Sequence, residues 1–215
     1  MTVKVKVKIC GINDFDAMEA AVDGGADFVG LVLYPPSPRA VTVEEAADLT
    51  ELVPEGVVKV GLVVDADDRL LDGVMNRVRL DLLQFHGGES PERIEAVRLE
   101  YGMPVMKAIG VSEAADLGAL TAYAEVADWL LFDAKPPAGA FLPGGNAAAF
   151  DWRLLKGRKW PVPWMLAGGL SAANAAEAVR LSGAKAVDVS SGVESAPGVK
   201  DAEKIAAFLK AAKGG

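Results

Sequence analysis

The sequence is poor in cysteine and in positive charge. Cys10 is its one cysteine, so an intramolecular disulfide is excluded, and we expect a reducing cytoplasmic compartment rather than secretion. Lys and Arg number 22 against 30 Asp and Glu. The resulting net charge of −8 argues against nucleic acid as the main partner. Any anion that the protein binds must therefore be held by local groups.

Long apolar runs are absent as well. No run approaches the roughly 18 to 20 residues of a membrane span, so we expect no membrane partner. The segment 1–8 alternates valine with lysine and lacks the apolar stretch of a signal peptide. With 215 residues, of which 51% are hydrophobic and 24% charged, the chain is predicted to form one globular domain over 1–215.

The sequence does contain short apolar runs that alternate with amphipathic segments, a pattern typical of parallel strands joined by crossover helices. Eight units of about 27 residues predict a single (β/α)8 TIM barrel. The expected strands are Val3–Cys10, Phe28–Leu33, Val57–Val64, Leu82–Phe85, Met103–Ile109, Trp129–Phe132, Trp164–Ala167 and Ala186–Val189. The expected helices include Phe15–Val22, Val43–Leu52, Ala66–Val78, Pro91–Tyr101, Ala173–Ser182 and Ala202–Ala212.

An open doubly wound sheet is the alternative fold. Such a sheet normally carries a glycine-rich dinucleotide turn after its first strand, whereas this turn reads Cys10-Gly11-Ile12-Asn13. In a barrel, the active site lies at the carboxyl ends of the strands. The polar and small residues expected there are Cys10, Arg39, His86, Asp133, Gly168-Gly169 and Asp188-Val189-Ser190-Ser191-Gly192.

Two turns of small residues predict a phosphate site. Gly168 and Gly169 follow the seventh expected strand, and Ser190, Ser191 and Gly192 follow the eighth. Small residues let backbone N–H groups approach an anion, and these two loops are where such barrels frequently hold phosphate. Either loop alone is equally consistent with a tight turn, so the prediction depends on both together.

Cys10 is predicted to face the mouth of the barrel. Alternation along the first strand turns Val7 and Ile9 toward the helices, and Lys8 and Cys10 toward the interior. A lysine cation below the thiol would help to lower its pKa, as a thiolate base requires. The alternative is a small buried apolar cysteine, the commonest fate of a lone one.

Asp133 opens a segment rich in proline, glycine and alanine that continues to Phe150. Long loops in compact domains are usually functional or mobile, so we interpret this one as a lid over the mouth. An ordinary surface excursion is the alternative. Asp133 itself is a candidate acid, and a capping or turn-forming aspartate is the other interpretation.

Several motifs resemble those of the phosphoribosylanthranilate isomerase family. They occur in order from Lys8 to the terminal helix, without large gaps. They are Lys8-Ile9-Cys10-Gly11-Ile12, Gly30-Leu31-Val32 with Ser37-Pro38-Arg39, Leu83-Gln84-Phe85-His86-Gly87, Leu131-Phe132-Asp133, Gly144-Gly145 with Phe150-Asp151-Trp152, Ala167-Gly168-Gly169-Leu170 and Val187-Asp188-Val189-Ser190-Ser191-Gly192-Val193-Glu194.

The resemblance implies an Amadori rearrangement of N-(5-phosphoribosyl)anthranilate to 1-(2-carboxyphenylamino)-1-deoxyribulose 5-phosphate, within tryptophan biosynthesis. It implies no metal and no organic cofactor. Asp133 matches the general acid that protonates the ribose ring oxygen. Cys10 matches the base that removes the proton from ribose C2.

The resemblance also assigns substrate contacts. Arg39 matches a position near the anthranilate, and a guanidinium fork suits a carboxylate. His86 and Asp188 match positions that line the pocket, and Lys8 below the thiol completes the expected substrate-binding set. For Arg39 the alternative is a solvated loop charge, and His86 could simply finish a strand.

The chain departs from the family pattern after Gly144-Gly145. Asn146-Ala147-Ala148 stands where many relatives have Thr-Gly-Lys or similar, which removes a cation and a hinge glycine. Asn13 stands where threonine is frequent. The rival interpretations are another sugar-phosphate barrel, of histidine biosynthesis or an indole-glycerol phosphate synthase, and a barrel that binds phosphate without turnover. A monomer or a homodimer is expected.

Overall fold

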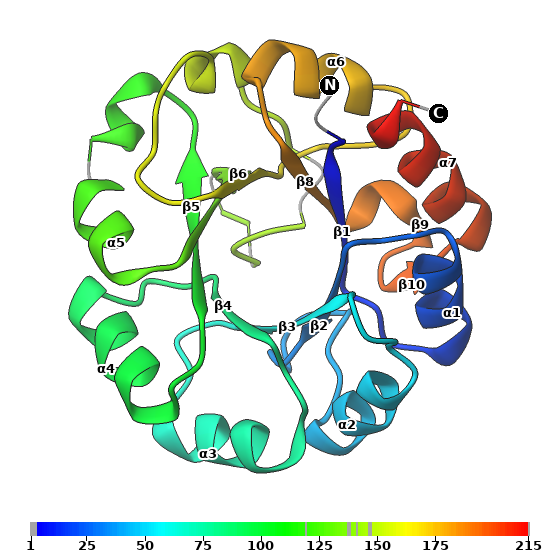
Figure 1. The fold of residues 1–215 in the computed structure, drawn as a ribbon, viewed down its shortest axis with the longest axis vertical. Coiled ribbons are helices and arrows are strands. Elements are labelled where there is room, and N and C mark those ends of the chain that lie inside the picture. Colours follow the sequence, from blue (N-terminus) through cyan, green and yellow to red (C-terminus); the bar gives the residue numbers. More distant parts are fainter. Residues whose placement is uncertain (1–3, 119, 137–138, 141, 146–147, 215) are drawn as a thin grey trace.

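Eight parallel strands pair in chain order and close into a barrel, which Figure 1 shows in a view down the barrel. The computed structural model describes residues 4–118, 120–136, 139–140, 142–145 and 148–214. The barrel closes where the first strand pairs with the eighth, with Lys8 opposite Asp188. The strands are β1 (Lys6–Cys10), β2 (Phe28–Val32), β3 (Val58–Val63), β4 (Leu82–Phe85), β5 (Val105–Val111), β6 (Trp129–Ala134), β7 (Trp164–Leu166) and β8 (Ala186–Val189).

Helices form a ring outside the strands (Figure 1). Five of them begin after a capping residue whose side chain accepts a hydrogen bond from the backbone N–H three residues later, and these caps are Asp14, Thr42, Asp67, Ser90 and Asp201. Every helix in the described ranges is too short or too polar to span a bilayer. The α-helices are α1 (Phe15–Asp23), α2 (Val43–Glu51), α3 (Asp68–Arg77), α4 (Pro91–Tyr101), α5 (Leu120–Val126), α6 (Ala175–Ser182) and α7 (Ala202–Lys213).

The predicted barrel is confirmed, and the strand bounds differ from those expected by at most three residues. The expectation of eight repeated units is wrong in one place. Among the described residues, no α-helix links β6 to β7, and that crossover contains the long segment after Ala134 and a 3-10 helix, η2 (Trp152–Leu155). The segment is rich in proline and glycine, which do not sustain a helix interior.

Three short elements follow β8 that the sequence did not indicate. A 3-10 helix, η3 (Ser191–Val193), leads into a hairpin of β9 (Glu194–Ala196) and β10 (Val199–Lys200). A 3-10 helix, η1 (Ala114–Leu117), also precedes α5. Each of these elements is shorter than the window over which a hydrophobic period can be recognised.

The core has an outer layer, between strands and helices, and an inner one. Val7 and Ile9 belong to the outer layer, whereas Lys8 and Cys10 point inward, as the alternation of β1 predicted. The inner layer is filled at its base by side chains from seven strands, β2 to β8, and the cavity described below lies above it. The base consists of Phe28, Val60, Leu82, Met106, Ala108, Leu131, Met165, Ala167 and Ala186.

A buried ion pair in the outer layer fixes the loops after β3 and β4. The ammonium group of Lys107 donates to Glu89 Oε2 at 2.7 Å and to the Gly87 carbonyl at 2.6 Å. The Glu89 carboxylate also accepts hydrogen bonds from the backbone of Asp65 and of Gly87. The second of these loops follows His86, so the network holds the end of β4 in place.

We expect Glu89→Ala to lower the free energy of unfolding by about 3 kcal/mol, because it leaves the Lys107 cation buried without its partner. Urea unfolding of the purified protein measures the loss. Glu95→Ala, at an exposed position on α4, is the matched control and should change stability by less than about 0.5 kcal/mol. Equal effects of the two substitutions would contradict the role given to the pair.

Candidate active site

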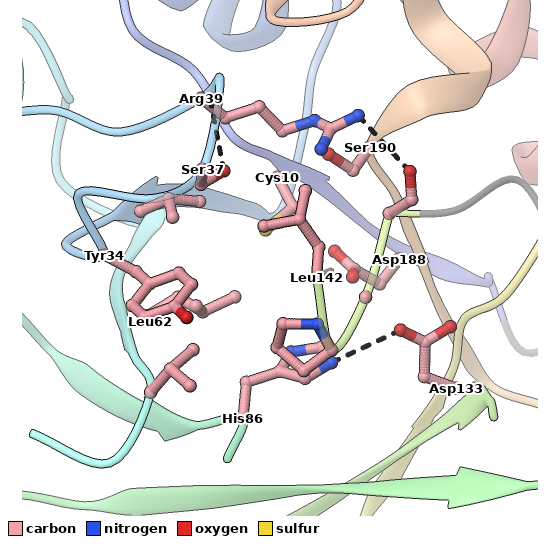
Figure 2. A pocket seen from close by; sticks show the side chains of 15 residues that line it. Cys10, Tyr34, Ser37, Arg39, Leu62, His86, Asp133, Leu142, Asp188 and Ser190 are labelled. Carbon is pink, nitrogen blue, oxygen red and sulfur yellow. Dashed lines mark hydrogen bonds and ion pairs between the residues drawn. The ribbon is translucent and has the colours of Figure 1, made fainter. Parts of the chain in front are cut away.

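A cavity opens at the carboxyl ends of the strands, where the sequence placed the site. Both catalytic candidates, Cys10 at the end of β1 and Asp133 in β6, line it. Figure 2 shows them on different sides of the cavity, with the side chain of Leu142 between them in that view. The predicted residues Arg39, His86, Asp188 and Ser190 line the same space.

A second cavity adjoins the first, between the loops after β7 and β8. The two cavities share Asp133, Gly144, Gly145, Asp188 and Ser190, so they form one continuous site. The structure therefore brings the whole predicted phosphate set together beside the catalytic candidates. That set consists of Gly168, Gly169, Ser190, Ser191 and Gly192, all of which line the second cavity.

Glycine is required in these turns by conformation and by space. Gly168 and Gly169 have φ values of +87° and +65°, in the left-handed region. A Cβ added to Gly192 would lie 1.9 Å from the carbonyl oxygen of Leu170. In the described part of the chain, the N–H groups of Gly168, Gly169, Ser191 and Gly192 have no protein acceptor. The tight turns thus leave backbone donors free beside the cavity.

Lys8 lies beneath Cys10 and is fully buried. Its ammonium group is 3.0 Å from Asp188 Oδ1. Burial lowers the pKa of Lys8, but Asp188 and Cys10 outweigh it and the pKa is raised above its ordinary value. A Cβ on Gly30 would lie 3.0 Å from both Cys10 Sγ and Lys8 Nζ, so glycine is needed at this point of β2.

Lys8 is only one of several groups that shift the pKa of the Cys10 thiol. Burial raises the pKa of Cys10, the cation of Lys8 lowers it, and the charge of Asp188 raises it. The net direction is upward, because Cys10 is only 4% exposed and a thiolate there loses its hydration. The predicted contribution of Lys8 to the pKa of the thiol is confirmed, and burial, which the prediction did not weigh, outweighs it.

Asp133 and His86 meet across the first cavity. The Asp133 Oδ1 atom accepts a hydrogen bond from the N–H of Ala134 at 2.8 Å, and Oδ2 lies 3.4 Å from His86 Nε2 (Figure 2). Both side chains are 12% exposed. Asp133 is therefore an oriented carboxyl group at the site, rather than a helix cap.

Arg39 is held by a partner that sequence reasoning did not assign. Its Nε and Nη2 atoms donate to the two carboxylate oxygens of Glu194 at 2.7 and 2.9 Å. Glu194 also binds Lys200 at 2.8 Å, and Lys200 donates to the Ser190 carbonyl at 3.0 Å. The solvated-charge interpretation of Arg39 is wrong, since its side chain is only 7% exposed.

The pairing of these groups shifts two pKa values. Burial raises the pKa of Glu194, but Arg39 and Lys200 lower it more, so the net direction is downward. Burial lowers the pKa of Lys200 below its ordinary value, although Glu194 opposes this. Glu194 belongs to one of the motifs that resemble the family, but its contact with Lys200 depends on the β9–β10 hairpin, which no local sequence pattern indicated.

Part of the predicted lid covers the cavity. Leu142, Pro143, Gly144 and Gly145 line the first cavity, and the Gly145 carbonyl accepts a hydrogen bond from Arg39 at 3.4 Å. A Cβ on Gly144 would lie 2.7 Å from His86 Nε2 and 3.0 Å from Asp133 Oδ2, so this glycine permits close approach. Asn146 and Ala147 lie outside the described residues, and lid motion stays a prediction.

The balance of charges on Cys10 predicts a shift of its titration. Asp188→Asn should lower the pKa of the thiol, because it removes a negative charge that opposes the thiolate. The ultraviolet absorbance of the thiolate measures this without ambiguity, since the chain has one cysteine and Cys10→Ala supplies the background. Asp16→Asn makes the same charge change on an exposed helix position and should leave the titration unchanged. A rise in the thiol pKa on Asp188→Asn would contradict the account.

Comparison with known proteins agrees with this geometry. The family described as N-(5'phosphoribosyl)anthranilate (PRA) isomerase matches residues 7–211. A protein of Paramagnetospirillum magneticum named N-(5'-phosphoribosyl)anthranilate isomerase is 69% identical over 211 residues, which are 98% of each chain. One of Rhodospirillum rubrum with the same name is 57% identical and covers 97% of this chain and 98% of its own.

Solved structures give the same result. Phosphoribosyl anthranilate isomerase from Thermotoga maritima superposes with a TM-score of 0.87 at 37% identity, covering 98% of this chain and 99% of that one. A structure of such an isomerase in complex with reduced 1-(o-carboxyphenylamino)-1-deoxyribulose 5-phosphate has a TM-score of 0.83 at 34% identity, with the same coverage. The resemblance carried by the motifs is confirmed, and the chain belongs to the N-(5'-phosphoribosyl)anthranilate isomerase family.

Proposed function

We propose that the joined cavities carry out the Amadori rearrangement of N-(5-phosphoribosyl)anthranilate, with Asp133 as the acid and Cys10 as the base. The product is 1-(2-carboxyphenylamino)-1-deoxyribulose 5-phosphate, an intermediate of tryptophan biosynthesis. The observation that carries this proposal is the convergence of a carboxyl group and a thiol on one cavity that continues into the two phosphate turns.

Ring opening begins the reaction. Asp133 carries a proton when the substrate binds and transfers it to the ribose ring oxygen as the bond from C1 to that oxygen breaks. The lone pair of the anthranilate nitrogen then forms the C=N bond of an imine cation. The rotamer of Asp133 suits this step, because Oδ1 is already bound to the backbone and Oδ2 faces the cavity.

Cys10 completes the rearrangement. Its thiolate removes the proton from C2, the electrons of that bond form an enolamine, and tautomerisation yields the ketone. Burial raises the pKa of Cys10, so the thiolate needs nearby positive charge. Lys8 supplies part of it, and the imine cation that forms next to C2 supplies more at the moment when the base is needed.

The two ends of the substrate are anionic, and each has a matching region. Backbone N–H groups of the turns at Gly168-Gly169 and Ser191-Gly192 surround the phosphate. Arg39 serves the anthranilate carboxylate through Nη1, because Glu194 occupies Nε and Nη2. Arg39 can therefore be buried against Glu194 and still bind the substrate, because each partner uses different nitrogen atoms of the guanidinium group.

The setting of the enzyme follows from the same features. We place it in the cytoplasm, where a thiol base stays reduced. The solved relative with the reduced product analogue supports a phosphorylated small molecule as the ligand of this site. A monomer and a homodimer are both compatible with a cavity that opens at one end of a single barrel.

Removing either catalytic group should abolish most turnover without unfolding the barrel. We expect Cys10→Ala and Asp133→Asn each to lower kcat by roughly 10²- to 10⁴-fold, the usual contribution of a general acid or base. The loss of substrate fluorescence in a steady-state assay measures the rate, and circular dichroism checks the fold. Near wild-type rates in either variant would refute its assigned role. Intact ligand binding by a wild-type protein without turnover would favour the binding-only interpretation.

An added charge in the phosphate turns should weaken binding. Ser191→Asp places a carboxylate beside the phosphate and should raise KM by about a hundredfold, because like charges in a site cost several kcal/mol. Ser195→Asp adds the same charge at an exposed position of β9 outside the second cavity and is the matched control. A similar KM in the two variants would count against the phosphate site.

A further inference from the structure

Gln84 is a fully buried polar residue that the reaction above does not use. It lies in β4 with its side chain 0% exposed, between Leu62 of β3 and Met106 of β5 in the strand register. His86 follows two residues later and therefore projects from the same face of the chain, nearer the mouth. The Gln84 amide nitrogen lies 3.1 Å from His86 Nδ1, so an interior amide supports the imidazole from below.

The amide oxygen of Gln84 indicates whether Gln84 or His86 donates the hydrogen bond between them. Within the described part of the chain, Gln84 Oε1 is buried and has no hydrogen-bond partner. The opposite amide orientation would give that oxygen a partner but leave both amide N–H bonds unpaired. Buried donors without a partner are rarer than carbonyl oxygens without one. Gln84 therefore donates to His86 Nδ1, and the neutral imidazole must carry its proton on Nε2.

The tautomer of His86 matters because His86 Nε2 lies beside the carboxyl group of Asp133. Its Oδ1 atom accepts the N–H of Ala134, so the proton of the acid form resides on Oδ2. His86 Nε2 lies 3.4 Å from the same oxygen, as the dashed line in Figure 2 marks. An Nε2 lone pair would compete with the substrate for the acid proton, whereas an Nε2–H donates to Oδ2 and leaves that proton for the substrate.

We infer that Gln84 is a positioning residue that fixes the Nε2–H tautomer of His86, and that this N–H stabilises the Asp133 carboxylate produced by ring opening. The inference rests on the proposed role of Asp133 as the acid. When Asp133 gives its Oδ2 proton to the ring oxygen, the O–H electrons stay on Oδ2 as a negative charge. The Nε2–H group of His86 donates a hydrogen bond to that charge without giving up its proton. The same hydrogen bond then orients Asp133 for the next cycle.

Nuclear magnetic resonance tests the tautomer directly, because His86 is the chain's one histidine and its ring signals need no assignment. Two-bond nitrogen–proton correlations of the full-length protein, recorded at a pH where the imidazole is neutral, should show Nδ1 as the unprotonated nitrogen. An unprotonated Nε2 would overturn the inference. This result does not depend on turnover, so it stands apart from a failure of the proposed acid and base roles.

Gln84→Glu tests the consequence. A carboxylate below the ring accepts a hydrogen bond, so Nδ1 should become protonated in every state of His86. The resulting Nδ1–H tautomer would take up the acid proton of Asp133, and an imidazolium would hold Asp133 as its carboxylate. Either state impairs the acid, and we expect kcat to fall roughly ten- to a hundredfold with KM changed little.

Two controls separate positioning from a general disturbance of the barrel interior. Leu82→Met changes the neighbouring interior residue of the same strand and should leave kcat within about twofold of the wild type. In a His86→Ala background, Gln84→Glu should cause less than about a threefold further loss, since Gln84 acts through the imidazole. An equal loss with and without His86 would overturn the inference even if Asp133→Asn is inactive.

Discussion

The ion pair between Lys8 and Asp188 is the interaction on which the site depends most. It joins β1 to β8 where the barrel closes, with Lys8 fully buried and Asp188 almost buried at the floor of the cavity, so loss of either partner would leave the other charge uncompensated. Cys10 follows Lys8 by two residues, and Ser190 follows Asp188 by two. Closing the barrel through this pair therefore places the thiol and the turn after β8, the second of the two proposed phosphate turns, next to each other where β1 meets β8.

The two candidate catalytic groups, Cys10 and Asp133, have different surroundings. Cys10 has a cation below it and little exposure, so in the proposed mechanism its charged form depends on the positive charge that the substrate develops. Asp133 has one oxygen bound to the backbone and the other beside the imidazole of His86, so its proposed role as the acid uses the oxygen that faces the cavity. An acid and a base can thus coexist in one cavity because each responds to a different neighbour.

Close approach of backbone and side chains shapes the cavity walls. At Gly30 a side chain would contact Cys10 and Lys8, and at Gly144 it would contact His86 and Asp133. Glycines in the β7 and β8 loops free backbone donors for an anion in a protein whose net charge is −8. Glycines in the cavity walls therefore leave room for the neighbouring side chains. The charged side chains pair with one another beneath and beside these walls.

Sequence reasoning located the barrel and the site because both depend on local patterns. The alternation of β1 predicted that Lys8 and Cys10 face inward, and the strand-end rule selected Arg39, His86 and Asp133. It could not find the contact of Glu194 with Lys200, which a short hairpin creates. Nor could it show that the described part of the crossover from β6 to β7 holds no α-helix. It also missed Gln84, because the role inferred for it rests on the distance to His86 and on an Oε1 atom without a partner among the described residues. The net pKa direction of Cys10 depends on burial, which no local pattern reports.

The central claim is that Cys10 and Asp133 act on one sugar whose phosphate is held by the turns after β7 and β8. The most direct measurement is a crystal structure of the Asp133→Asn protein with reduced 1-(o-carboxyphenylamino)-1-deoxyribulose 5-phosphate. The account predicts phosphate oxygens on the N–H groups of Gly169 and Gly192, with Cys10 Sγ within reach of C2 and residue 133 next to the C4 hydroxyl derived from the ring oxygen. A phosphate bound elsewhere, or C2 turned away from Cys10, would contradict it.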